Sequence, residues 1–127
     1  MSATTARIGS VVLDCPDPRA LADFYSELLG WPRDPEPDPD DGWVELANPD
    51  GGAGLSFQRA DNYRTPTWPD PEVQQQLHLD LGVDDLDAAQ ARALELGARL
   101  LDDQGMKNTG FRVYADPAGH PFCLCRN

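Results

Sequence analysis

Positive charge is scarce in this sequence of 127 residues. Ten lysines and arginines stand against 22 aspartates and glutamates, which gives a formal net charge of −12 at pH 7. Such an excess of negative charge repels nucleic-acid phosphates and anionic lipid headgroups. The composition therefore argues against nucleic-acid binding and against binding at a membrane surface. The simplest role of the acidic residues is solubility.

Cysteines and long apolar runs are also few. The three cysteines (Cys15, Cys123 and Cys125) are odd in number, and two residues two apart on one strand cannot form an undistorted disulfide. We therefore expect no disulfide framework. No run approaches eighteen apolar residues, and the first thirteen residues contain a single arginine, so neither a membrane span nor a leader peptide is expected. A soluble protein of the reducing cytoplasm is the default expectation.

The length suits one domain with its own core, and the apolar spacing divides it into two halves. In the first half, Asp17 is placed to cap a helix and Gly30 to end it. A loop rich in proline and aspartate follows that helix. Strands are expected at 8–15, 43–47 and 54–59, and the helix at 19–29.

The second half follows a connecting loop rich in proline. Its helix is expected at 86–96, with Leu94 among the residues on the buried side and Gly97 at the end. Its strands are expected at 76–83, 98–101, 111–115 and 122–125.

The first strand of the second half carries the clearest candidate chemistry. In its sequence QLHLDLGV, leucines and valine alternate with polar residues, as in a strand with one buried face. His78 and Asp80 then point to one side, with Cα atoms about 7 Å apart. One interpretation is a general base or ligand-binding pair, the imidazole being oriented by the carboxylate. The other is a structural pair that supports the curvature of the sheet.

The two halves repeat with an offset of 68 positions. That shift places SVVLDCPD, which begins at Ser10, on HLDLGVDD, which begins at His78, and it places NPDG on DPAG. A one-residue difference in length then sets Ser56 on Cys123. This self-similarity predicts a duplicated unit of one strand, one helix and about three further strands. The two copies are expected to pair, because one copy alone would leave a sheet face uncovered.

This layout resembles the vicinal oxygen chelate superfamily, and within it the glyoxalase-like and bleomycin-resistance-like proteins. The motifs FYSELLGW, at the end of the first helix, and DPAGHPFCL, before the last strand, carry the resemblance. It implies an α+β fold in which two βαβββ modules pair into a curved mixed sheet around a pocket. Residues 1–127 would form one domain, with modules at 7–60 and 76–127 joined by a loop at 61–75. The resemblance also implies a homodimer.

Metal ligands in that superfamily lie on the first and last strands of each module. By resemblance, those positions here are Ser10, Ser56, His78 and Cys123, of which only His78 matches the usual ligand types. If the one-residue difference in length between the halves means that Ser56 is not the matching position, Gln58 is the next candidate metal ligand. We therefore expect no tightly bound metal. The alternative is a divalent ion (Zn, Ni, Mn or Fe) held by His78, Gln58 and Cys123.

Aromatic residues are sufficient to line an apolar pocket. We expect Trp68 to act as its lid or as a dimer contact, whereas Phe57 suits the core equally well and His120 suits a turn. Cys123 beside His78 could form a nucleophile with its base, but a buried cysteine is more often a packing residue. The residues expected to line the ligand pocket are Ser10, Trp43, Ser56, Gln58, Trp68, His78, Asp80 and Cys123.

The expected function is the binding of a small organic molecule in this pocket, without a catalytic metal. The alternative is a metal-dependent lyase, isomerase or dioxygenase of the vicinal oxygen chelate type that uses His78, with Asp80 as a further catalytic candidate. A structural or regulatory module without a ligand is the third interpretation. The sequence leaves open whether the protein is an enzyme.

Overall fold

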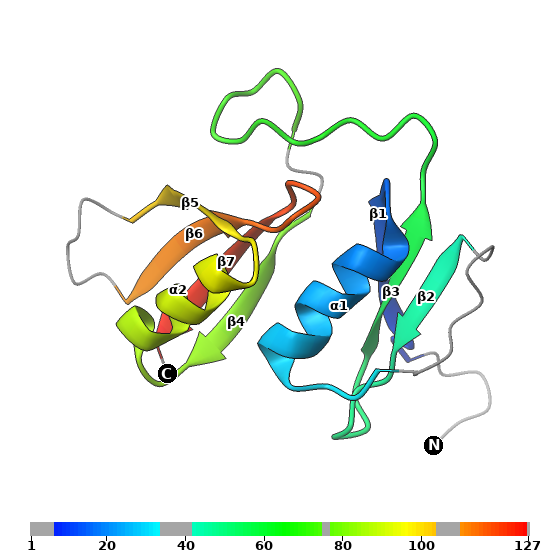
Figure 1. The fold of residues 1–127 in the computed structure, drawn as a ribbon, viewed down its shortest axis with the longest axis horizontal. Helices are drawn as coiled ribbons and strands as arrows, with labels where there is room; N and C mark the ends of the chain where they lie inside the picture. Colours follow the sequence, from blue (N-terminus) through cyan, green and yellow to red (C-terminus); the bar gives the residue numbers. More distant parts are fainter. Residues whose placement is uncertain (1–6, 34–41, 75–76, 104–109, 127) are drawn as a thin grey trace. The chain divides into compact units, whose positions relative to one another are not determined.

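A computed structural model describes residues 7–33, 42–74, 77–103 and 110–126 of the chain. The chain forms two compact units, residues 1–61 and residues 62–127. Each unit has its own sheet and its own helix (Figure 1). Within the described residues, neither helix has the length and apolar character needed to cross a membrane.

The first unit contains β1 (Ser10–Cys15), α1 (Pro18–Leu29), β2 (Trp43–Leu46) and β3 (Gly54–Arg59). The strand order is β1-β3-β2, with β1 parallel and β2 antiparallel to β3. The predicted signals for α1 are confirmed, since Asp17 accepts a hydrogen bond from the amide of Ala20 and Gly30 is left-handed at φ 69°. The rings of Tyr25 on α1 and Phe57 on β3 stack with centroids 5.8 Å apart in the buried core.

The second unit contains β4 (Leu79–Val83), α2 (Leu86–Glu95), β5 (Arg99–Asp102), β6 (Phe111–Ala115) and β7 (Pro121–Arg126). The strand order is β4-β7-β6-β5, with β4 parallel to β7 and the other pairs antiparallel. Asp85 caps α2 by accepting from the amide of Ala88. The stacked rings of Tyr114 and Phe122 lie in the core.

Two details of the second unit differ from the prediction. Leu94 is 41% exposed rather than buried, because a step of one residue turns a helix by about 100° and Ala93 already points into the core. The first strand begins at Leu79, because Leu77 and His78 precede it without strand pairing, and residue 76 lies outside the described residues. In the first unit the described residues form two strands after the helix. The predicted loop rich in proline and aspartate falls largely on residues 34–41, which lie outside the described residues.

The strand registers support the internal repeat. In the first unit Val12 lies opposite Ser56, and in the second Asp80 lies opposite Cys123. Both pairs join parallel first and last strands, so the offset of 68 and the one-residue gap hold in three dimensions. Two helices with two mixed sheets confirm the predicted α+β class. The pairing of the modules into one curved sheet remains a prediction.

Candidate functional site

The candidate site lies on the face of the second sheet that α2 does not cover. Directly paired residues of neighbouring strands share a face, and one such row runs Asp80, Cys123, Val113, Asp102 across all four strands. Tyr114 belongs to the opposite face, where its hydroxyl donates to Gln90 of α2 at 2.9 Å. Strand alternation therefore separates the row at the site from the core under α2.

A pocket of about 270 Å³ opens on this face. Most of its wall is apolar, and its polar groups are an imidazole, a thiol, a carboxylate and the N–H of an indole. Every lining residue belongs to the second unit. The lining residues are Trp68, His78, Asp102, Phe111, Val113, Pro121 and Cys123.

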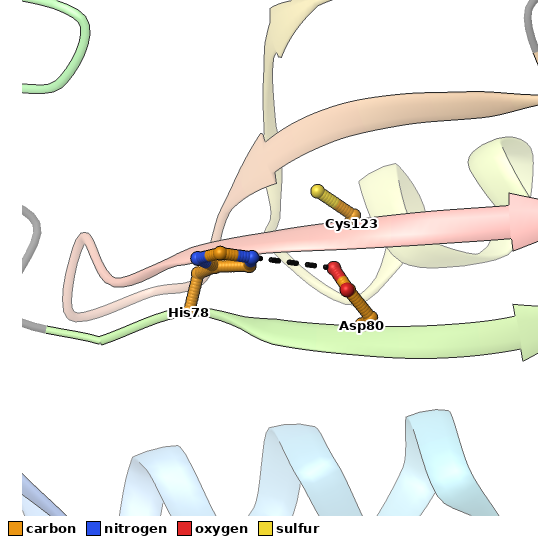
Figure 2. A group of neighbouring side chains, drawn as sticks. All are labelled: His78, Asp80 and Cys123. Carbon is orange, nitrogen blue, oxygen red and sulfur yellow. Dashed lines mark ion pairs between the residues drawn. The ribbon is translucent and has the colours of Figure 1, made fainter.

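His78 and Asp80 make the contact that the strand spacing left open. Their side chains lie on the same side of β4, with Nε2 and Oδ1 3.4 Å apart (Figure 2). The side chains are 45% and 64% exposed, so both are accessible to a ligand at the pocket edge. An imidazole held in this way at a pocket edge can donate or accept a hydrogen bond.

The Cys123 thiol faces the same pair from β7 (Figure 2). Burial raises its pKa to about 12, and a hydrogen bond to Asp80 and the negative charge of that carboxylate act in the same direction. A thiol needs a depressed pKa to act as a nucleophile near neutral pH. The environment of Cys123 therefore argues against the nucleophile interpretation.

Three side chains at the site carry atoms of the types that bind metal ions. One ligand atom each from His78, Asp80 and Cys123 lie within 4.8 Å of one another. Nitrogen, oxygen and sulfur are all ligands of zinc, and tetrahedral zinc would require separations of roughly 3.5 Å. The exposed His78 and Asp80 side chains can rotate to close that difference. Asp80 supplies the third donor, a place for which the sequence suggested Gln58, a residue of β3 in the first unit.

The corresponding positions of the first unit carry no such donor set. The hydroxyls of Ser10 and Ser56 lie 2.7 Å apart and bond to each other. They line a separate pocket of about 490 Å³ that includes Glu45. Glu45 accepts a hydrogen bond of 2.9 Å from the indole of Trp43. Glu45 was not among the expected site residues; alternation in WVEL sets it on the face opposite to Val44 and Leu46, and the β2–β3 register places it opposite Ser56.

Three further aromatic residues divide between the core and the pocket. Phe57 is fully buried, which is one of the two roles expected for it, and Tyr114 is buried as well. Phe111 lines the pocket and was not among the residues expected there. Phe111 lies two residues before Val113 on β6, so strand alternation would have placed both side chains on the same face. His120 is more than a turn residue, because it is 2% exposed and its Nδ1 lies 2.9 Å from the buried Asp116 carboxylate. The side chain of Tyr63 contacts this histidine.

Comparison with known proteins gives a consistent family and fold. A family model described as a glyoxalase-like domain matches residues 10–125. A glyoxalase/bleomycin resistance protein/dioxygenase family enzyme from Burkholderia phytofirmans PsJN is 17% identical, with a TM-score of 0.68 over 95% of this chain and 98% of that one. A glyoxalase-related enzyme from Fulvimarina pelagi is 20% identical, with a TM-score of 0.66 over 97% and 89%.

A third structure comes from a protein with a described ligand class. TnmS3, an antibiotic binding protein from Streptomyces sp. CB03234, is 25% identical, with a TM-score of 0.59 over 98% of each chain. No curated protein matches the sequence. The predicted architecture is thus confirmed at the level of the fold.

Proposed function

Because the chain belongs to the glyoxalase-like domain family, we propose that it binds a small organic molecule in the pocket of its second unit, without a tightly bound catalytic metal. Within this family's fold the chemistry is set by the site and not by the architecture. The observation that carries the proposal is the pocket of about 270 Å³ with apolar walls and a polar edge.

The pocket suits a flat, largely apolar ligand with one polar group. Trp68 and Phe111 offer aromatic surface for stacking, and Val113 and Pro121 complete the apolar wall. His78 lies at the edge, where a ligand hydroxyl, carbonyl or amine can bond to its imidazole. The likeness to an antibiotic binding protein supports sequestration as the role.

Fluorescence titration with N-phenyl-1-naphthylamine, a neutral aromatic probe, tests the proposal. We expect saturable binding that Trp68→Ala weakens about tenfold, since loss of a stacked indole removes on the order of 1.4 kcal/mol. Trp31→Ala is the matched control, because Trp31 is a half-buried tryptophan of the first unit. Absence of binding, or equal losses in both variants, would contradict the assignment.

A second candidate function is that of a metal-dependent lyase, isomerase or dioxygenase. The grouping of His78, Asp80 and Cys123 favours it. A bound divalent ion would act as a Lewis acid there, and the side chains of this chain would hold and orient it. Binding to the native state raises thermal stability, so Zn²⁺, Ni²⁺, Mn²⁺ and Fe²⁺ are titrated with unfolding as the readout. A rise that His78→Ala abolishes, with metal present in the purified protein, would favour this candidate over metal-free binding.

The remaining expectations are proposals of the same kind. We propose a homodimer in the reducing cytoplasm. Participation of Ser10, Trp43, Ser56 and Gln58 in ligand binding also remains a prediction. Light scattering at several protein concentrations tests the dimer.

A further inference from the structure

We propose that Tyr63, His120 and Asp116 form a latch that fixes residues 62–74, the Trp68 loop, and thereby positions the aromatic wall of the pocket. The proposal rests on the ligand-binding function proposed above and names the device that preorganises that site. None of the three residues lines the pocket, so they would act as positioning residues.

The base of the latch is the turn between β6 and β7. Asp116 is 3% exposed, and its Oδ1 accepts hydrogen bonds from the amides of Ala118 and His120 at 2.9 and 3.0 Å. Its Oδ2 lies 2.9 Å from Nδ1 of His120. One carboxylate thus fixes both the backbone of the turn and the orientation of the imidazole. Buried groups with several partners hold a single conformation.

Tyr63 connects the Trp68 loop to that turn. Its hydroxyl donates to the carbonyl of Ala118 at 2.8 Å and lies 3.2 Å from Nε2 of His120. The two rings are 5.5 Å apart between centroids. A single oxygen atom therefore joins segments 57 residues apart in the sequence.

A close approach of backbone and side chain supports the same attachment. Gly119 has φ +94°, and a Cβ atom there would overlap the Cγ2 methyl of Thr65. Only glycine fits such a position without strain. The turn is therefore shaped to receive the start of the Trp68 loop.

Hydrogen bonds within the Trp68 loop connect its attached end to Trp68. The Thr67 amide donates to the Val73 carbonyl at 3.0 Å, and the Val73 amide donates to the Thr67 hydroxyl at 2.9 Å. The Asp70 amide donates to the Thr67 carbonyl at 2.8 Å. Trp68 thus sits on a closed, self-bonded loop, and fixing one end of the loop restricts the indole.

The same turn also leads directly into a second part of the pocket wall. Pro121 and Cys123 of β7 line the pocket immediately after the turn. Since the Trp68 loop and β7 share one anchor, the separation of the two walls depends on the latch. Preorganised walls reduce the entropy lost on binding.

Tyr63→Phe removes the connecting oxygen and leaves the ring. We expect the affinity for N-phenyl-1-naphthylamine to fall about fivefold, the size of one lost hydrogen bond. Tyr114→Phe is the matched control, because it also removes a tyrosine hydroxyl bonded within the second unit, but on the α2 face. Its affinity should equal that of the unaltered chain.

A second readout requires no ligand. In a Trp31→Phe, Trp43→Phe background, Trp68 is the remaining tryptophan of three, and acrylamide quenching reports its accessibility. We expect Tyr63→Phe to increase the quenching constant and Tyr114→Phe to leave it unchanged. Thr65→Ala, a change at an exposed residue, should act like Tyr63→Phe and replaces it if that variant does not fold.

The two readouts separate the latch from the proposed function. Unchanged quenching in both loop variants would overturn the latch, whether or not the probe binds. Increased quenching without probe binding to the unaltered chain would support the latch and contradict the binding proposal. Increased quenching with unchanged affinity would overturn the claim that the latch positions the wall for binding.

Discussion

Single residues at the site have properties that only their surroundings can set. Cys123 is the clearest case, because its pKa of about 12 comes first from burial and then from Asp80. At pH 8 such a thiol is ionised to roughly one part in ten thousand. We therefore expect its alkylation by iodoacetamide to be slow at pH 8 and to rise about tenfold per pH unit up to pH 11.

Mass spectrometry of the alkylated peptide measures that profile separately from the other cysteines. Asp80→Asn should raise the rate at pH 8, because it removes the carboxylate charge that disfavours the thiolate. Burial still acts in that variant, so the pKa should stay above the ordinary value of 9.0. A plateau of the rate near pH 9 in the unaltered protein would contradict this environment for Cys123.

Residues that act through partners distant in sequence were the hardest to predict. The alternation in QLHLDLGV was enough to place His78 and Asp80 on one side of β4. It did not indicate that Asp80 would face Cys123 as a third donor, because that depends on the register between β4 and β7. The contact of Tyr63 with His120 depends on the path of a loop, which hydrophobic periodicity does not encode.

Secondary-structure elements were predicted well where their ends carry a local signal. The capping Asp17 and the left-handed Gly30 lie where the sequence placed them, whereas the cap of α2 by Asp85 was not predicted. Leu94 shows the limit of this reasoning, because the short α2 has few apolar residues to define its buried face. The late start of β4 has a different cause, since its pairing with β7 begins with Leu79 opposite Phe122 and not at the first alternating residue.

The cap of α1 gives a test at this scale. Asp17→Ala removes the acceptor for the Ala20 amide, and we expect the free energy of unfolding to fall by about 1 kcal/mol. Asp17→Asn should cost far less, because an asparagine oxygen also caps. Urea denaturation measures both variants. Equal losses would mean that the negative charge near the helix, and not the hydrogen bond, stabilises α1.

At the scale of the whole chain, net charge is the dominant electrostatic feature. A charge of −12 on 127 residues repels itself in the folded state. Exposed ion pairs such as Arg92 with Glu95, at 3.2 Å, oppose this effect weakly, since each such pair contributes about 0–1 kcal/mol. The balance predicts that screening by salt stabilises the protein.

Thermal unfolding at increasing NaCl concentration measures this balance. Between 0.01 and 0.15 M salt the screening length falls from about 30 to 8 Å, and we expect the midpoint to rise by roughly 2–4 °C. The rise should level off once the screening length is shorter than the spacing between charges, whereas a general salting effect would continue with concentration. A fall in the midpoint would mean that local ion pairs outweigh the repulsion among the acidic residues. The same screening should leave binding of the neutral probe nearly unchanged, because its proposed contacts with Trp68 and Phe111 are apolar.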